Sequence, residues 1–138
     1  MTDCIFCRIA SGEIPATIIA RNDDAIAFRD LNPQAPTHVL IIPVVHVGGM
    51  AEADSDPAER LVGRCLRLAV QVAKQLGLDE GGYRLVINTG RDGGQSVFHV
   101  HVHLLGGRRL GWPPGWGSSR LLGMKMPKTR RTPRIARG

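Results

Sequence analysis

The chain reads GGQSVFHVHVHLLGG over residues 93–107, so that histidines at positions 99, 101 and 103 alternate with apolar residues. Successive side chains leave a strand on opposite faces, and this alternation therefore predicts a strand that carries the three histidines on one face. A helix would scatter the same rings, because residues two apart do not share a helical face. The other face is predicted to enter a core with these side chains: Phe98, Val100, Val102 and Leu104.

Three imidazoles in register can bind a metal, move protons or attack an electrophile. The glycines at positions 93 and 94, just before them, supply backbone N–H groups that can surround an anion. A single histidine on an apolar strand is more often a structural residue. Three of the chain's five histidines on one strand, behind such a loop, favour a functional site.

The 138 residues suffice for one domain with its own core, and the hydrophobic fraction of 43% is typical of a soluble globular protein. No stretch approaches the ~18 apolar residues that span a bilayer, and the first residues do not resemble a signal peptide. We therefore expect a cytoplasmic or nuclear protein that does not contact a membrane. Its three cysteines are expected to stay reduced or to bind metal.

The net charge of +6 is concentrated at one end of the chain. Residues 117–138 contain seven Lys or Arg and no acid, whereas residues 1–116 contain eleven basic and twelve acidic residues. We predict a folded domain over residues 1–116 and a disordered basic tail over residues 117–138. Such a tail either binds nucleic acid or is a solvated extension without a partner.

Apolar patterning and turn residues predict the other elements. A short helix is expected between Cys4 and Ala10. A long helix is expected from Asp56, the predicted N-cap, to Gly77, which ends the apolar periodicity. Four short strands are expected in addition, over residues 17–20, 25–29, 38–43 and 83–88.

Cys4 and Cys7 form a C-x-x-C pair, and thiolates together with imidazoles suit tetrahedral zinc. Four ligands are needed, so His46 and His99 are the natural candidates to complete the set. The alternative is a pair of buried thiols without metal, because cysteine often packs as a small hydrophobe.

Asp30 follows a predicted strand and precedes the turn signal Asn32-Pro33. Its carboxylate either caps that turn or binds sugar hydroxyls, and the local sequence does not choose between the two.

Together these stretches resemble the histidine triad (HIT) family, whose signature alternates three histidines with apolar residues. The similarity is closest to the Hint branch, the purine nucleoside phosphoramidases, and covers about residues 3–115. Besides the triad it includes DLNPQAPTH at 30–38, DGGQSV at 92–97 and GGRRLGWPPG at 106–115. The chain departs from the pattern after Trp116, because members of this branch usually end near Trp-Pro-Pro-Gly.

The resemblance implies an α+β protomer with a five-stranded antiparallel sheet, one long helix and one short helix. It further implies a homodimer with one continuous ten-stranded sheet, in which the segment from Trp112 reaches towards the partner's active site.

The resemblance also implies a mechanism. His101 would attack the α-phosphorus of a purine nucleotide held in a phosphoramidate, or in an aminoacyl-adenylate, and water would then release the nucleoside monophosphate from a nucleotidyl-histidine. His103 and Ser96 would lie near the leaving group, with Ser96 helping to protonate a departing amine. His99 completes the triad, and His38 would support it.

The remaining site residues follow by position. The resemblance implies that Asp30 binds the ribose hydroxyls, and so favours this role over turn capping alone. The phosphate would be held by Asn88, Gly94, Gln95, Ser96 and Val97. The base pocket would include Phe6, Ile9, Phe28 and Leu31, which fit a plain core equally well, together with Trp112. A structural Zn²⁺ without an open coordination position would be bound by Cys4, Cys7, His46 and His99.

Two other functions stay open from the sequence. One is a related hydrolase that acts on dinucleoside polyphosphates, or on adenylated DNA ends as aprataxin does. The other is a nucleotide sensor or scaffold with a tail that contacts nucleic acid.

Overall fold

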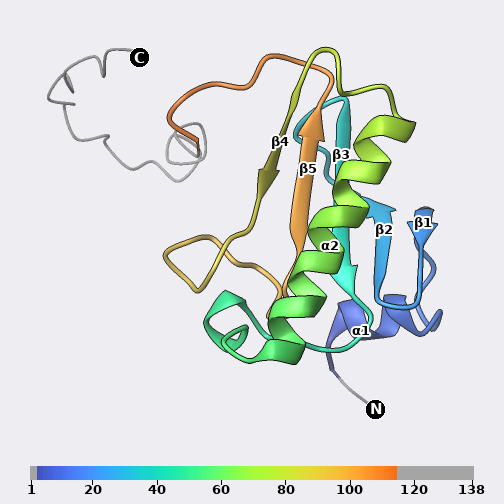
Figure 1. Cartoon of the computed structure of the whole chain (residues 1–138), viewed down its shortest axis with the longest axis vertical. Coiled ribbons are helices and arrows are strands. Elements are labelled where there is room, and N and C mark those ends of the chain that lie inside the picture. Colours follow the sequence, from blue (N-terminus) through green and yellow to red (C-terminus); the bar gives the residue numbers. More distant parts are fainter. Residues whose placement is uncertain (1–2, 115–138) are drawn as a thin grey trace, which may run out of the picture.

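A single sheet of five antiparallel strands, in the order β1-β2-β3-β5-β4, forms the centre of the molecule (Figure 1). The structure is a computed structural model and describes residues 3–114, so the predicted tail over 117–138 lies outside it. The predicted α+β class, with five antiparallel strands, one short helix and one long helix, is confirmed. In chain order the elements are α1 (Ile5–Ala10), β1 (Ile18–Arg21), β2 (Ala25–Arg29), β3 (Thr37–Pro43), the 3-10 helix η1 (Met50–Glu52), α2 (Asp56–Gln75), β4 (Tyr83–Val86) and β5 (Val102–Gly106).

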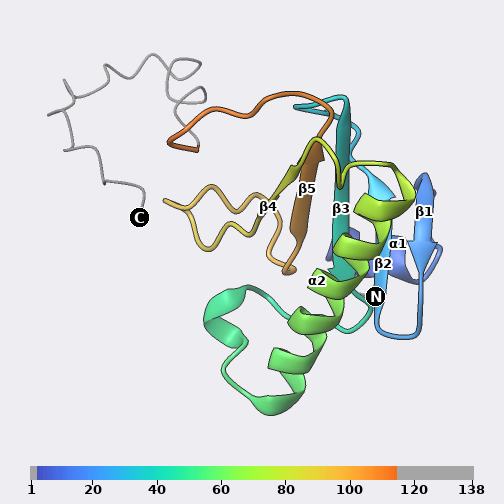
Figure 2. The ribbon, with the colours of Figure 1, turned by 45° about the horizontal axis from the view of Figure 1, so that its top comes forward.

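The two faces of the sheet are covered by different helices (Figures 1 and 2). Strand β3 shows the division, because its side chains alternate between the faces. Val39 and Ile41 pack in the core under α2, whereas Leu40 and Ile42 pack with Phe6 of α1 on the opposite face. The face under α2 is therefore a continuous apolar core, and chemistry-bearing side chains are confined to the α1 side.

Helix α2 begins one residue earlier than the sequence predicts. Ser55, rather than Asp56, is the N-cap, and its side chain accepts a hydrogen bond from the N–H of Ala58. Pro57 then occupies the first turn, where its missing N–H costs nothing. Gly77 follows the helix with φ +73°, as the predicted stop requires. No helix within residues 3–114 is both long and apolar enough to cross a membrane.

The histidine strand is shorter than the alternation predicts. Strand β5 begins only at Val102; His99 lies in a bend, and Val100 and His101 have no regular secondary structure. Continued beyond Ile41–Val102, the register of β3 with β5 would pair Ile42 with His101 and then Pro43 with Val100, but Pro43 has no N–H to donate to the ladder. The N–H of Val100 donates instead to Val47 O at 2.6 Å.

The departure from a regular ladder affects one predicted core residue. Phe98 is 63% exposed, so the prediction that it enters the core is wrong. The other three apolar residues of the alternation, Val100, Val102 and Leu104, are buried as predicted.

This packing predicts a contrast between two substitutions. Ile41→Ala, at a fully buried position between α2 and the central strands, should lower the free energy of unfolding by about 2–5 kcal/mol. Val70→Ala, on the solvent side of α2, should change it by less than about 0.5 kcal/mol. Urea denaturation of the two variants checks this, and equal losses would contradict the assignment of the α2 face.

Candidate active site

His99 is the most enclosed histidine, and its side chain is fully buried. Its Nε2–H donates to the carbonyl of Pro43 at the end of β3, with an N···O distance of 2.9 Å. A carbonyl only accepts, so the lone pair of the neutral ring lies on Nδ1. Burial is the main cause of a lowered pKa for His99, which favours this neutral form.

The Nδ1 atom of His99 lies in a cluster with Cys4, Cys7 and His46. Its distances are 3.3 Å to the Cys4 Sγ, 3.4 Å to the Cys7 Sγ and 3.2 Å to the His46 Nδ1. Ligands of a tetrahedral zinc ion are separated by about 3.3–3.8 Å, given Zn–N and Zn–S bonds of about 2.0 and 2.3 Å. The four predicted ligands are thus brought together, and the cluster could hold a metal ion.

His101 is held by the backbone of the same segment. Its Nδ1 lies 2.7 Å from the carbonyl oxygen of His99, so Nδ1 carries the proton and donates. In the neutral ring the lone pair is therefore on Nε2. Phe6 of α1 packs edge-on against His101, with ring centroids 5.1 Å apart, and also against His99 at 5.9 Å. His101 is consequently a buried base with a defined reactive nitrogen.

A chain of hydrogen bonds orients His103. The N–H of Gln34 donates to Nδ1 of His38 at 3.0 Å, which leaves the His38 proton on Nε2. That Nε2 lies 2.9 Å from Nδ1 of His103. His103 therefore accepts at Nδ1 and presents an N–H at Nε2, with its ring centroid 5.0 Å from that of His101.

The environment keeps this pair of rings neutral. The pKa of His103 is lowered to about 4, chiefly by burial and next by the nearby rings of His101 and His38. Asp30 raises the pKa of His103, but by less than these effects lower it. Burial also lowers the pKa of His38, although the nearby carboxylate of Asp30 acts to raise it. Both rings are thus neutral near pH 7 and act through hydrogen bonds.

The glycine-rich loop turns back on itself before the histidines. Gly94 has φ +83°, and the N–H groups of Gly94 and Gln95 donate to Arg91 O and Gly90 O inside the loop. The N–H groups of Ser96 and Val97 have no acceptor among residues 3–114, and the Ser96 side chain is exposed. Of the predicted phosphate-binding backbone, these two groups are available to an anion.

Gln95, whose backbone the resemblance assigns to the phosphate, is fixed in place by its side chain. Its side chain is buried and accepts from Gly90 N at 3.0 Å, while Nε2 donates to Gly48 O at 2.7 Å and to Val97 O at 3.1 Å. Its side chain thus ties the loop to the residues that follow His46, and does not project into the site.

Asp30 lies at the edge of the histidine cluster. One carboxylate oxygen caps the turn by accepting from the N–H of Asn32 at 2.8 Å, and the other lies 3.4 Å from Nε2 of His38. The turn-capping role that the sequence left open is therefore present.

The predicted base-pocket residues divide into two groups. Phe6, Ile9 and Phe28 are buried in the core on the α1 face, where Phe6 and Phe28 stack edge-on at 5.7 Å. Leu31, in contrast, is 99% exposed.

A groove of about 1010 Å³ opens beside His103 and His38 and contains the predicted residues Asn88 and Trp112. Two further lining residues, Arg84 and Arg108, were not predicted from the sequence. The position of Arg84 could have been predicted from the sequence. Arg84, Val86 and Asn88 are two residues apart in one predicted strand, and residues two apart share a face. No local sequence pattern predicts that Arg108 lines the groove.

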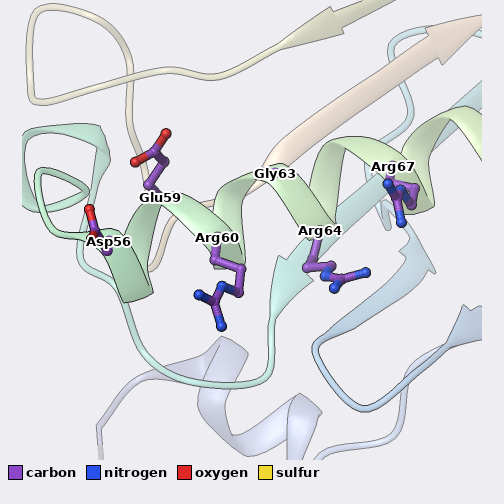
Figure 3. A pocket seen from close by; sticks show the side chains of 6 residues that line it. All are labelled: Asp56, Glu59, Arg60, Gly63, Arg64 and Arg67. Carbon is purple, nitrogen blue, oxygen red and sulfur yellow. The ribbon is translucent and has the colours of Figure 1, made fainter.

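A second hollow of about 520 Å³ lies on the solvent side of α2 (Figure 3). Its lining contains neither histidine nor cysteine, and α2 covers the opposite face of the sheet from the triad. We therefore do not assign it to the site. Its lining residues are Asp56, Glu59, Arg60, Gly63, Arg64 and Arg67.

The arrangement on the α1 face combines a buried nucleophilic nitrogen, a neutral N–H donor and two unpaired backbone N–H groups. This set can attack an electrophile that carries anionic oxygens and can stabilise the charge that develops on them.

Comparisons with known proteins agree with this geometry. The family model described as "HIT domain" matches residues 11–110. The chain is 54% identical over 113 residues to a "14 kDa zinc-binding protein" of Zea mays, covering 80% of this chain and 87% of the relative. It is 50% identical to "Adenylylsulfatase HINT1" of Arabidopsis thaliana, covering 80% of this chain and 76% of the relative. It is 47% identical to the "Purine nucleoside phosphoramidase" of Escherichia coli K12, with 79% and 91% covered. Among solved structures, a HIT family hydrolase from Legionella pneumophila Philadelphia 1 superposes with a TM-score of 0.79 at 50% identity, covering 82% of this chain and all of that one.

The lowered pKa of His103 predicts a specific pH dependence of stability. An unfolded histidine titrates near ~6.5, so between about pH 6.5 and 4 the unfolded chain binds more protons than the folded one, and stability falls as the pH falls. Because the ring keeps some solvent contact, we expect this site to contribute about 1–2 kcal/mol to that loss. Urea unfolding at pH 7 and pH 4.5 should show a smaller loss in His103→Gln than in the wild type. Effects of acid on other residues are common to both proteins and cancel, so equal losses would contradict the assignment.

Proposed function

The chain belongs to the HIT family of nucleotide hydrolases, with relatives in its Hint branch, and from this premise we propose that it hydrolyses purine nucleoside phosphoramidates through a nucleotidyl-histidine intermediate. The observation that carries the proposal is the state of His101. Its Nδ1–H is bonded to the carbonyl of His99, so its lone pair is on Nε2. The loop just before it contains the N–H groups of Ser96 and Val97, which have no acceptor within residues 3–114. The E. coli relative is named for the same activity, which supports the choice of a P–N bond.

In the first step Nε2 of His101 attacks the α-phosphorus, a P–N bond to the ring forms, and the P–N bond to the leaving amine breaks. The exposed hydroxyl of Ser96 protonates the departing amine and is reprotonated by water. The positive charge gained by the His101 ring is stabilised through its Nδ1–H by the His99 carbonyl. In the second step water attacks the phosphorus, the bond to Nε2 breaks, and one proton of the water is released to the solvent.

The remaining groups bind and orient the nucleotide. The N–H groups of Ser96 and Val97 and the Nε2–H of His103 are donors for the phosphate oxygens. Asn88 is a further donor, since it lines the groove beside His103. Asp30 is placed near His38 to accept from ribose hydroxyls with the lone pairs that the turn leaves unused. Phe6 and Phe28 supply the apolar surface for a base.

We propose that Cys4, Cys7, His46 and His99 bind a structural zinc ion. The donor set and its spacing fit tetrahedral zinc, and the Zea mays relative is named as a zinc-binding protein. Such an ion would supply no chemistry of its own, because four protein ligands leave no open position. These residues instead hold α1 against the segment that carries His101.

We also propose a homodimer. Strand β4 forms one edge of the sheet, and Trp112, beyond β5, is 83% exposed beside the groove. An exposed aromatic residue next to an edge strand supports a contact with a second copy, whose Trp112 would reach this site.

The mechanism predicts that His101→Ala loses AMP release from an adenosine phosphoramidate by about 10³-fold or more, because the nucleophile is gone. Thermal unfolding should show that the variant still folds. Mass spectrometry of wild-type protein quenched during turnover should show AMP on His101. Dinucleoside polyphosphate and adenylated DNA, assayed side by side, should turn over more slowly. Undiminished turnover by His101→Ala would remove the mechanism, and faster cleavage of either alternative would redefine the substrate.

The zinc proposal predicts one zinc ion per chain in protein dialysed against metal-free buffer, as measured by elemental mass spectrometry. Cys7→Ser should lose the ion and unfold at a lower temperature, because α1 is no longer tied to His46 and His99. Cys65→Ala is the matched control. This thiol is on the buried face of α2, and burial raises its pKa to about 12. The substitution should therefore leave the zinc content unchanged. Metal-free wild-type protein, or zinc retained by Cys7→Ser, would contradict the site.

A further inference from the structure

The groove beside His103 continues past the reacting groups and reaches Arg84. In the pairing of β5 with β4, His103 is opposite Val86 and Leu105 is opposite Arg84. Opposed residues share a face of the sheet, so Arg84 stands in the row next to that of His103, about 7 Å further along the strands. This row lies on the side of His103 away from His101. The family resemblance implies that His103 lies near the leaving group, so this end of the groove is the leaving-group end in the proposed mechanism.

Arg108 forms the other wall at this end of the groove. It donates to the carbonyl of Gln34 from Nε at 3.3 Å and from Nη2 at 2.8 Å, whereas Arg84 donates from Nη2 to Gly111 O at 2.9 Å. These bonds link the segment after β5 to β4 and to the turn before β3. Figure 1 shows this segment leaving the end of β5 and running outward past β4. Each guanidinium has five N–H donors, so both keep donors for a ligand.

The charge of the two arginines is not compensated. None of the fifteen residues that line the groove is acidic, and neither arginine forms an ion pair with a carboxylate of residues 3–114. Their only hydrogen-bond acceptors within those residues are neutral carbonyl oxygens. Two positive charges therefore face a cavity that opens at His103.

We propose that Arg84 and Arg108 form a leaving-group subsite that selects leaving groups with a negative charge of their own, such as amines that carry a carboxylate. The inference rests on the proposed function, since it concerns the part of the substrate expelled from phosphorus. Guanidinium groups bind carboxylates through paired, charge-assisted hydrogen bonds, which are stronger than bonds between neutral groups.

The test uses two AMP phosphoramidates of equal size, one made with 4-aminobutanoate and one with 4-aminobutanamide. The ratio of their kcat/KM values is measured for the full chain and for its variants, so that the intrinsic difference between the amines cancels. We expect the wild type to prefer the acid, and Arg84→Gln or Arg108→Gln to lower the ratio at least about tenfold. Arg84→Lys keeps the charge and should retain part of the preference. Arg67→Gln, on the solvent side of α2, is the control and should leave the ratio unchanged.

A purely structural role for the arginines would lower both rates together and leave the ratio unchanged, which would overturn the inference. The inference would also be overturned if the control variant lowered the ratio as much. Failure of the proposed function is distinguishable, because neither substrate would then release AMP from the wild type. The subsite is supported if the wild type releases AMP from both substrates, and if Arg84→Gln and Arg108→Gln lower the ratio of kcat/KM values while Arg67→Gln leaves it unchanged.

Discussion

The site depends on the position of His99, which joins three parts of the molecule. Its Nε2–H is bonded to the end of β3 at Pro43, its Nδ1 lies against Cys4 and Cys7 at the N-terminal helix, and its backbone carbonyl accepts from His101. The same residue thus completes the cluster of cysteines and histidines and orients the proposed nucleophile. A shift of His99 would move the acceptor that determines which nitrogen of His101 carries the proton. The N-terminal helix is therefore coupled to chemistry at the start of β5 through one side chain and one carbonyl.

The two faces of the sheet have different roles: one packs the apolar core, and the other carries the side chains of the candidate site. On the face under α2, fully buried side chains such as Ile41 and Leu104 form an apolar core. Such cores are packed as tightly as organic crystals and resist small displacements. On the other face the same strands carry His103 and, through the groove, Arg84. Because successive residues of a strand alternate between faces, each strand contributes to a rigid base and to the site at once.

The electrostatics of the site follow from burial more than from charge pairs. Burial is the main cause of the lowered pKa values of His38, His99 and His103, so these rings are neutral and differ only in which nitrogen donates. Neutral rings suit attack on a phosphorus that carries negative oxygens, since one nitrogen must offer a lone pair and others must donate. Positive charge is kept to the far end of the groove, at Arg84 and Arg108. The centre that attacks phosphorus and the proposed region that recognises the leaving group are thus distinct.

From the sequence, the family resemblance implied the fold class and the candidate site residues, and local patterns predicted the individual elements. A period of two in residues 98–104, cap and stop signals around α2, and glycines before the histidines are all local, and local sterics and hydrogen bonding decide them. The sequence also brought Cys4 and Cys7 together as a candidate pair by spacing alone. It placed Phe98 in the core wrongly, because the ladder between β3 and β5 ends at the pair Ile41–Val102, before it reaches Phe98.

Only the tertiary structure decided which nitrogen of each ring holds a proton, where Gln95 is buried, and which residues line the groove. Each of these depends on a partner that the chain reaches by folding: the carbonyl of Pro43 for His99, that of Gly48 for Gln95, and that of Gln34 for Arg108. Hydrogen bonds are specific in distance and direction, and no pattern along the sequence contains the position of a remote backbone atom.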